Sequence, residues 1–361
     1  MNHANPRSSS PLVASSDSRR AFIRGAAGLV VAAPIANAFA AAILAGDVTT
    51  GSGGHVYRVE HDWLTPPAGL AWGDTHGVAQ DKAGNIYISH TVGGEATKDD
   101  AVYVFTKDGA FVRSMLPQMK GCGHGLDVRD EGGVEFLYHC DVNRRRVLKT
   151  TLDGKVLWER GAPVEAEFAG AKIYGGENDW NPTNVAFHPN GDVFIGDGYG
   201  KSFVHIYSKD GAFKSTIVGP GSGEGQVSCP HGLWWDDRVN RLAVADRSNN
   251  RIQYFAESGA NQPWKHVSFV KDSMRQPCHF KTREDLLLVP DLSSAVELLG
   301  KDNKALAVLG DGHPTNLRGA ARKDFIPGKF VHPHSATFLA DGSILVVEWV
   351  PIGRVTKLTR V

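Results

Sequence analysis

Pro230-His231-Gly232-Leu233 is one of six short segments that share a pattern and decide the fold. In five of them a histidine opens an apolar run, and in the sixth, Pro182-Thr183-Asn184-Val185-Ala186, an asparagine takes its place. The other four are Thr75-His76-Gly77-Val78, Gly123-His124-Gly125-Leu126, Cys278-His279-Phe280 and Pro333-His334-Ser335-Ala336. The steps 76→124→184→231→279→334 are 48, 60, 47, 48 and 55 residues long. A repeat of about 40–50 residues is typical of four-stranded propeller blades.

The residues between these segments follow the same order of strands and turns in each repeat. A second apolar strand follows each inner one, as in Ile86-Tyr87-Ile88 and Val193-Phe194-Ile195. Asp-Gly turns such as Lys107-Asp108-Gly109 and Lys209-Asp210-Gly211 lie between later strands, and this dipeptide is a strong hairpin signal. The sequence therefore predicts an all-β, six-bladed propeller with four-stranded blades.

The two ends of the repeat region predict how the ring closes. The last repeat supplies three strands before Val361, and an unpartnered strand over 54–60 precedes the first repeat. We expect that strand to complete the last blade, which would protect an open sheet edge. Insertions over 162–180 and 311–329 precede the third and sixth inner strands, and long loops of this kind shape binding mouths.

Composition argues against two classes of partner. The chain has 361 residues, of which 42% are hydrophobic and 22% are charged, as in ordinary globular proteins. Lysine plus arginine equals aspartate plus glutamate at 39 each. This balance predicts no binding to nucleic acid or to an anionic membrane surface.

The N-terminus carries the pattern of an export signal. Ser18-Arg19-Arg20-Ala21-Phe22-Ile23-Arg24 is a twin-arginine pattern, and a weakly apolar, alanine-rich stretch with small-residue cleavage sites follows. We expect a twin-arginine signal peptide over 1–41, a linker over 42–53 and the propeller over 54–361. The precursor would use the twin-arginine export machinery, and the mature protein would be periplasmic or secreted, with no membrane span.

Four cysteines leave several roles open. Cys122, Cys229 and Cys278 each lie within two residues of a repeat histidine, and Cys140 lies apart. In an oxidising compartment they could form disulfides with three connectivities, and they could also serve as extra ligands or as small buried apolar residues.

The recurring histidines predict a metal site. If each repeat is a blade, equivalent positions converge on one axis, so the scattered imidazoles become a ring. A divalent ion satisfies such a ring, and zinc is the usual choice for histidine ligands with one open position, although imidazole also suits copper, iron and nickel. The candidate metal ligands are His76, His124, His231, His279 and His334.

A second recurring position, at the end of the second strand, is mostly acidic. We expect most of these side chains to cap turns or pair with arginine, as Asp246 could with Arg251, and one or two to orient a metal-binding histidine. They are Asp141, Asp197, Asp246, Asp291 and Glu348, with His90 in the first repeat.

One stretch resembles a known repeat family. Ala245-Asp246-Arg247-Ser248-Asn249-Asn250-Arg251-Ile252-Gln253-Tyr254-Phe255 resembles the NHL repeat. Together with Pro230-His231-Gly232-Leu233 and Gly196-Asp197-Gly198-Tyr199, it is similar to peptidyl-α-hydroxyglycine α-amidating lyase over about residues 73–361. The resemblance implies an NHL/TolB-like six-bladed propeller, Zn²⁺ on His124, His231 and His334, a structural Ca²⁺, a catalytic tyrosine at Tyr199 and an active-site arginine at Arg247.

The sequence departs from the family pattern at three places. Thr91 stands where the family has a second catalytic arginine, and Ser335 stands where an aspartate follows the last zinc ligand and helps to hold calcium. His76 and His279 are additional to the three-histidine pattern. The resemblance therefore supports the family's propeller fold and metal site in this chain more strongly than it supports the lyase reaction.

These residues favour an exported metal-dependent enzyme that acts on a small-molecule or peptide substrate. The metal would polarise a substrate oxygen or activate water, which allows a C–N lyase or a hydrolase. Tyr199 would act as base with a pKa lowered by the cation and Arg247, and Arg247 would clamp a carboxylate or developing oxyanion. Two alternatives stay open: a non-catalytic propeller that binds peptide or glycan, and a redox protein with copper or iron on the additional histidines.

Overall fold

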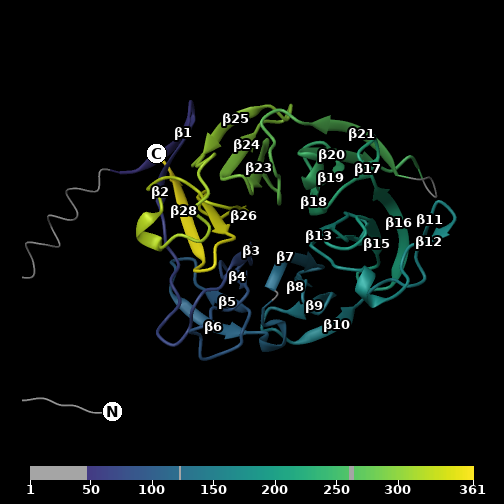
Figure 1. The fold of residues 1–361 in the computed structure, drawn as a ribbon, viewed down its shortest axis with the longest axis horizontal. Coiled ribbons are helices and arrows are strands. Elements are labelled where there is room, and N and C mark those ends of the chain that lie inside the picture. The colour runs from purple at the N-terminus through teal and green to yellow at the C-terminus, as the bar shows by residue number, and fades with distance from the viewer. Residues whose placement is uncertain (1–46, 122, 260–263) are drawn as a thin grey trace, which may run out of the picture. The chain divides into compact units, whose positions relative to one another are not determined.

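The computed structural model describes residues 47–121, 123–259 and 264–361. Their strands form seven sheets, of which six are blades arranged around a common centre, as Figure 1 shows, and these are antiparallel apart from one short parallel strand at the edge of blade 3. The seventh is a two-stranded hairpin in the insertion over 162–180, formed by β11 (Glu167–Phe168) and β12 (Ala171–Lys172). The predicted all-β six-bladed propeller is confirmed.

The chain runs through each blade from the inner strand outward. Blade 6 also contains β1 and β2, which precede blade 1 in the sequence. Blade 1 contains β3 (Thr75–Gln80), β4 (Ile86–His90), β5 (Val102–Phe105) and β6 (Phe111–Met115). Blade 2 contains β7 (Gly123–Glu131), β8 (Val134–Asp141), β9 (Arg146–Thr151) and β10 (Val156–Arg160). Blade 3 contains β13 (Asn184–Phe187), β14 (Val193–Gly196), β15 (Val204–Tyr207), β16 (Phe213–Pro220) and the parallel β17 (Gln226–Val227).

The other three blades complete the ring. Blade 4 contains β18 (Pro230–Asp236), β19 (Arg241–Asp246), β20 (Arg251–Ala256) and β21 (Lys265–Val270). Blade 5 contains β22 (Lys281–Arg283), β23 (Leu286–Asp291), β24 (Ala295–Leu299) and β25 (Ala305–Leu309). Blade 6 contains β26 (Pro333–Phe338), β27 (Ile344–Glu348), β28 (Arg354–Arg360), β2 (His55–Glu60) and β1 (Thr49–Ser52). Four short 3₁₀ turns are η1 (Pro117–Met119), η2 (Glu177–Asp179), η3 (Arg247–Asn249) and η4 (Arg322–Asp324).

The core consists of apolar layers between successive blades. One layer joins Tyr87 and Val104 of blade 1 to Leu137 and Leu148 of blade 2, and all four side chains are fully buried. Equivalent layers lie at each of the other five blade boundaries, including the boundary between blade 6 and blade 1. Because both faces of each sheet are covered by neighbouring blades, the second strands are continuous apolar runs in the sequence. The closed ring of blades also places the inner strands of all six around the central axis.

The N-terminal strands complete blade 6. β2 pairs antiparallel with β28, from Tyr57 opposite Arg360 to Glu60 opposite Lys357. Part of the expected linker over 42–53 is instead structured, because Thr49–Ser52 form β1 and pair with β2. The reason is a tight turn at Gly53 and Gly54, where Gly53 has a φ of 57° that suits glycine and folds β1 back on β2.

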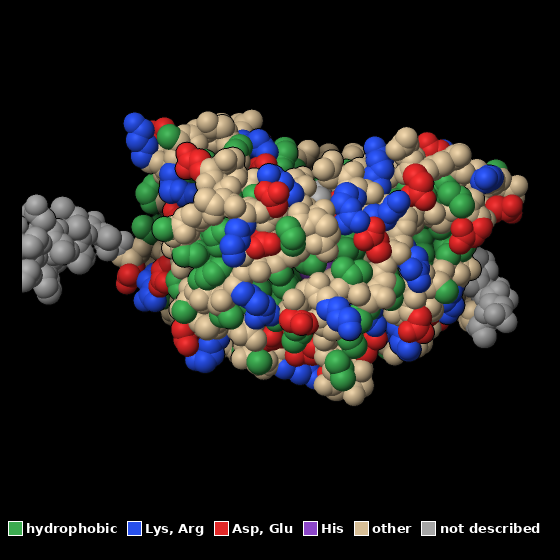
Figure 2. Space-filling model, turned by 90° about the horizontal axis from the view of Figure 1, so that it is seen from below, with side chains coloured by type: hydrophobic (Ala, Val, Ile, Leu, Met, Phe, Trp, Pro, Cys, Tyr) green, Lys and Arg blue, Asp and Glu red, His purple; other side chains and the backbone are tan. Residues whose placement is uncertain are grey.

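Acidic and basic side chains are interspersed on the face drawn in Figure 2, without a continuous patch of either sign. Among the described residues, no helix is long and apolar enough to cross a membrane. The expected signal peptide over 1–41 lies outside the described residues, so both the signal and the export route stay predictions.

Candidate metal centre

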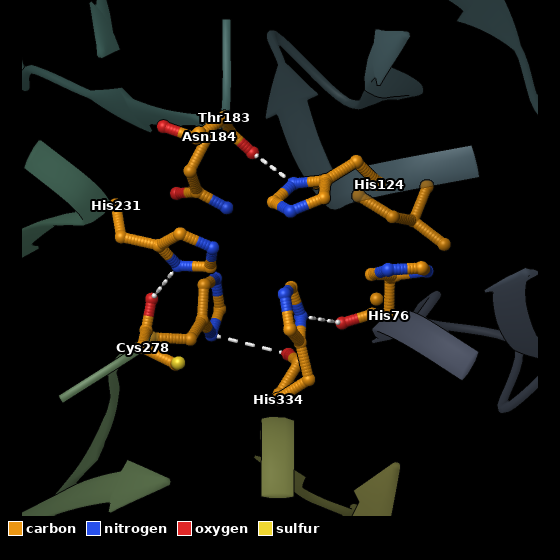
Figure 3. A pocket seen from close by; sticks show the side chains of 12 residues that line it. His76, His124, Thr183, Asn184, His231, Cys278 and His334 are labelled. Carbon is orange, nitrogen blue, oxygen red and sulfur yellow. Dashed lines mark hydrogen bonds between the residues drawn. The ribbon is translucent and has the colours of Figure 1, made fainter. Parts of the chain in front are cut away.

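All five predicted histidines line one small cavity at the centre of the ring. Figure 3 shows His76, His124, His231 and His334 extending from β3, β7, β18 and β26 toward a common centre. Asn184, which replaces histidine in blade 3, and Ser335 line the same cavity. The five histidines are 2–7% exposed, the largest value being that of His76. The periodic spacing in the sequence therefore corresponds to convergence in space.

Four of the imidazoles form a tight cluster. The ring centroids lie 4.6 Å apart for His76 and His334, 4.6 Å for His124 and His334, 4.8 Å for His231 and His334, and 4.9 Å for His124 and His231. The ligand atoms of His76, His124 and His334 all lie within 4.8 Å of one another. These side chains therefore offer two overlapping sets of three ligands, which share His124 and His334.

Local backbone features aim these side chains at the centre. The pairing of the inner strand with its neighbour shifts register at the histidine in blades 1, 2, 4 and 6. A bulge of this kind redirects a side chain. Only glycine fits after the histidine in blades 2 and 4, because any Cβ there would clash with the neighbouring blade. A Cβ at Gly125 would lie 2.4 Å from the Thr183 carbonyl oxygen, and one at Gly232 would lie 2.3 Å from the Cys278 carbonyl oxygen. The repeated His-Gly therefore lets neighbouring inner strands approach closely.

Hydrogen bonds fix which nitrogen of each imidazole is free. The Nδ1 atoms of three histidines contact backbone carbonyls of the next blade: His124 to Thr183 at 2.8 Å, His231 to Cys278 at 2.9 Å and His334 to His76 at 2.8 Å. His76 Nδ1 contacts the carbonyl of Asp74 at 3.1 Å. A carbonyl only accepts, so each Nδ1 carries the hydrogen and each Nε2 keeps a lone pair. This is the tautomer that binds a metal through Nε2.

Burial keeps these rings neutral. It lowers the pKa of His124, His231 and His334 well below the ordinary value, and neighbouring positive charge, including the other imidazoles, lowers it further. The pKa of His76 is lowered to about 4 by the same burial. Neutral imidazole is the form that binds a metal, so the cluster is ready to accept a cation at neutral pH.

Tyr199 closes one side of the cluster. Its hydroxyl lies 3.2 Å from His124 Nε2 and 3.0 Å from His231 Nε2. The phenol has a single hydrogen and both nitrogens carry lone pairs, so it can donate to only one of them. The other contact brings two lone pairs together in a buried place, which a bound cation would relieve. The residues present therefore fit a metal ion.

Arg247 contacts the hydroxyl and the ring of Tyr199. Its Nη1 is 3.4 Å from the Tyr199 hydroxyl, and its guanidinium lies 5.2 Å from the centroid of the phenol ring. Although 40% of Tyr199 is exposed, its hydroxyl faces buried imidazoles. Burial raises the pKa of Tyr199 to about 12, and Arg247 only partly offsets this. The expected fall of this pKa below 10 therefore requires more positive charge than Arg247 supplies.

His279 makes different contacts from the other four. Its Nδ1 lies 3.3 Å from the Ser335 hydroxyl, and its Nε2 lies 3.9 Å from a carboxylate oxygen of Asp127 without a hydrogen-bond partner. His279 shares the cavity but is not in the group of three closely spaced ligands.

The surroundings of His279 do not fit the structural calcium that the resemblance implies. Ser335 offers a hydroxyl in place of a carboxylate, and the buried carboxylate of Asp127, 3.9 Å from His279 Nε2, is already paired with Lys281. The ammonium of Lys281 donates to both of its oxygens, at 2.6 and 2.7 Å, and lies 4.2 Å from the Trp234 ring centroid. Blades 2 and 5 are opposite in the ring, so this ion pair joins the two sides of the channel. The Lys281 ammonium provides the positive charge that a calcium ion would otherwise provide to Asp127.

The acidic positions at the ends of the second strands have structural roles. Asp246 accepts from Arg251 Nε at 2.6 Å and from the Ser228 amide at 2.6 Å. Glu348 likewise pairs with Arg354. None of the four clustered histidines uses such a carboxylate through Nδ1, because backbone carbonyls take that position. Thr91, in place of the second arginine, accepts from the Asp74 amide at 2.9 Å and so helps to hold the start of β3.

The cysteines near the site are thiols in the structure. Among the described residues Cys140, Cys229 and Cys278 are free, and Cys122 lies outside them. Cys278 Sγ lies 4.0 Å from Arg247 Nη1, and burial raises the pKa of this thiol to about 12. Its backbone carbonyl, which holds His231, has the more direct part in the site.

Three features of the site could not be found from sequence spacing. The carbonyl partners of the imidazoles are backbone atoms and leave no sequence signal. The Asp127–Lys281 pair joins residues 154 positions apart, and Arg318 reaches Asp74 from the insertion over 311–329. That insertion was recognisable as a long loop, but its contacts were not.

Comparisons with known proteins agree with the motifs. The chain is 40% identical over 247 residues to the peptidyl-glycine alpha-amidating monooxygenase of Mus musculus, covering 60% of this chain and 24% of that protein. It is 27% identical over 338 residues to peptidyl-alpha-hydroxyglycine alpha-amidating lyase 1 of Drosophila melanogaster, covering 82% of this chain and 59% of that protein. The chain thus spans about a quarter of the mouse relative's length and resembles these amidating proteins. No protein-family model matches it.

Solved structures share the fold. A candidate gluconolactonase has a TM-score of 0.55 at 16% identity, covering 83% of this chain and 92% of its own. A streptogramin B lyase has a TM-score of 0.54 at 14% identity, covering 84% and 97%. The virginiamycin B lyase of Staphylococcus aureus has a TM-score of 0.53 at 12% identity, covering 84% and 100%. At these identities the likeness concerns the propeller architecture alone.

Proposed function

We propose that the chain is a zinc-dependent lyase that cleaves the C–N bond of a peptidyl-α-hydroxyglycine or a closely related N-acyl carbinol. The products would be the primary amide and glyoxylate. The observation that carries the proposal is the Tyr199 hydroxyl held between two buried imidazole nitrogens, 3.2 Å from His124 Nε2 and 3.0 Å from His231 Nε2. The similarity to amidating lyases supports the same reaction class.

His124, His231 and His334 would hold the metal, since they come from alternate blades and the carbonyl contacts of their Nδ1 atoms leave a lone pair on each Nε2. A zinc ion on three imidazoles supplies a Lewis acid with an open position for a substrate oxygen. His76 would be an alternative ligand beside them in the same cavity, because its ring lies 4.6 Å from that of His334.

Tyr199 would take the proton of the carbinol hydroxyl and pass it to the departing amide nitrogen. As the O–H bond breaks, the carbonyl of glyoxylate forms and the C–N bond electrons go to the nitrogen, so no net proton is consumed. Arg247, whose Nη1 is 3.4 Å from the phenol oxygen, would stabilise the negative charge on that oxygen. Because burial raises the pKa of the Tyr199 phenol to about 12, this role depends on the additional charge of the cation.

The test is an assay of glyoxylate release from N-benzoyl-α-hydroxyglycine, combined with elemental analysis of the same protein. We expect turnover that EDTA abolishes and zinc restores, and loss of both metal and turnover in His124→Ala. His266→Ala is the matched control, because His266 lies on the outer strand β21 and packs against Phe269 with ring centroids 4.2 Å apart. Stoichiometric zinc without turnover would refute the lyase and favour a binding module, and copper or iron with a visible absorption band would favour redox chemistry.

We also propose that the chain is exported through its twin-arginine segment and functions in the periplasm or outside the cell. The Arg19-Arg20 pair and the alanine-rich stretch after it support this. Replacing both arginines by lysine should retain the full-length precursor in the cytoplasm. Unchanged appearance of processed protein in the periplasm would argue against this route.

A further inference from the structure

Arg318 is a second arginine near the imidazole cluster, to which Asp74 connects it, and the lyase chemistry above gives it no role. It belongs to the segment between β25 and β26, and its Nη2 lies 2.7 Å from Asp74 Oδ1. Its guanidinium stacks 3.7 Å from the Trp349 ring centroid. Arginine combines readily with a carboxylate and an aromatic face in this way, since its planar group can use both at once.

The segment around Arg318 is anchored, so the guanidinium has a defined position. Leu317 and Ala320, on either side of it, pack against the buried side chains of Phe325, Val331 and Val350. The Arg318 amide also donates to Asn316 Oδ1 at 3.3 Å. A binding group held on a packed support loses little freedom when a ligand arrives.

Arg318 is close to the imidazole cluster through Asp74. Asp74 lies two residues before His76, and its carbonyl accepts the hydrogen of His76 Nδ1 at 3.1 Å. The ring of His76 lies beside those of His124 and His334 in Figure 3, with ring centroids 5.0 and 4.6 Å away. Arg318 thus stands where blades 6 and 1 meet, whereas Tyr199 and Arg247 come from blades 3 and 4. In a ring of six, these blades are opposite each other, so the imidazoles lie between two guanidinium groups.

The guanidinium of Arg318 retains hydrogen-bonding capacity. Asp74 engages one nitrogen, and Arg318 Nε is buried without a hydrogen-bond partner among the described residues. The side chain is 29% exposed, so part of the guanidinium is accessible to a ligand. The guanidinium carries five N–H donors, and charge-assisted hydrogen bonds from its accessible N–H groups to an anionic acceptor are strong.

We propose that Arg318 binds the carboxylate of the substrate and that Trp349 holds the guanidinium in the required plane. This deepens the proposed function and rests on it for the substrate class, an N-acylated glycine with a free carboxylate. Arg247 would then serve the phenol oxygen, and Arg318, on the other side of the imidazoles, would orient the glycine end. Selectivity for acids over the corresponding amides or esters would come from this residue.

The test measures equilibrium binding by calorimetry, so that it does not depend on turnover. The probes are N-benzoylglycine, which has the carboxylate but no hydroxyl to react, and its uncharged amide. Wild type should bind the acid at least tenfold more tightly than the amide. Arg318→Met should abolish that preference with little change for the amide, and Arg318→Lys should retain part of it.

Two further variants sharpen the result. Lys323→Met removes an exposed positive charge from the same segment and should leave the preference unchanged. Asp74→Asn frees Arg318 from its competing carboxylate and should tighten acid binding, a direction that a folding defect would not produce. Equal acid binding by wild type and a folded Arg318→Met, or no preference for the acid in wild type, would overturn the proposal. Acid binding that depends on Arg318 without any glyoxylate release would refute the lyase alone.

Discussion

The Tyr199 hydroxyl has one hydrogen and two nitrogen neighbours, and this mismatch makes it the most informative atom of the site. Tyr199→Phe removes the oxygen that lies 3.2 and 3.0 Å from the two nitrogens and leaves the imidazoles in place. We expect glyoxylate release to fall by about 10²–10⁴-fold, the usual contribution of a general base, with the zinc content unchanged.

Tyr207→Phe is the matched control for that experiment. The Tyr207 hydroxyl is buried without a hydrogen-bond partner, so its removal should leave turnover unchanged and stability equal or slightly higher. Equal turnover of Tyr199→Phe and wild type would remove Tyr199 from the mechanism.

The two overlapping ligand sets differ in one residue and can be told apart. The ligand atoms of His76, His124 and His334 all lie within 4.8 Å of one another. His124, His231 and His334 instead come from alternate blades, and each is oriented by a carbonyl of the next blade. We give the second set more weight, because that arrangement surrounds the axis evenly. His231→Ala should therefore weaken zinc binding by at least 100-fold and His76→Ala by less than tenfold, as measured by competition with a chelator. The reverse order would assign the metal to His76.

At the scale of single strands, Glu297 in β24 makes stability depend on pH. Burial raises the pKa of Glu297 to about 8, one carboxyl oxygen accepts from Ser273 Oγ at 2.5 Å, and the other has no partner. An acid with a raised pKa in the folded state is stabilising while protonated. That stability is present below the unfolded value of 4.5 and is lost as the pH rises toward 8.

Glu297→Gln should therefore flatten the pH dependence of the free energy of unfolding between pH 5 and pH 8. The wild-type slope from this residue is at most about 1.4 kcal/mol per pH unit, and its sign is negative. Chemical denaturation at both pH values measures it. Identical slopes in the two proteins would show that Glu297 titrates normally.

The closing strand β2 should contribute to the stability of the whole ring. Tyr57 in β2 is 2% exposed and packs with Leu298, Leu309 and Leu358 of blades 5 and 6. Tyr57→Ala should reduce the free energy of unfolding by about 3 kcal/mol through the lost burial and the remaining cavity. Arg58→Ala, at a position 40% exposed, should change it by less than about 0.5 kcal/mol. Similar small losses in both variants would indicate that blade 6 is stable without β2.

On the scale of the whole molecule, the sequence predicted the architecture well because propeller repeats carry their own register. The histidine positions, the Asp-Gly turns and the strand over 54–60 each correspond to an equivalent place in the ring. What the sequence could not predict depends on contacts between distant residues. Arg318 with Asp74 and Lys281 with Asp127 are examples, since nothing in the local pattern of either partner specifies the other.

The Lys281–Asp127 pair also predicts that the ring needs no calcium. Adding calcium to the zinc-loaded protein should leave the melting temperature unchanged, because the buried carboxylate is already neutralised. Lys281→Met leaves that carboxylate unpaired and should cost about 3–5 kcal/mol in thermal or chemical unfolding. A calcium-dependent rise in the melting temperature of wild type would show that calcium binds at a place other than the one considered.

The central claim is that imidazoles from alternate blades bind one metal ion at the axis of the propeller. X-ray absorption spectroscopy at the zinc edge, on protein purified from the periplasm, tests it most directly. The account predicts about one zinc per chain, with an imidazole shell of nitrogen ligands at about 2.0–2.1 Å. Absence of bound metal, or a shell of sulfur ligands near about 2.3 Å, would contradict it.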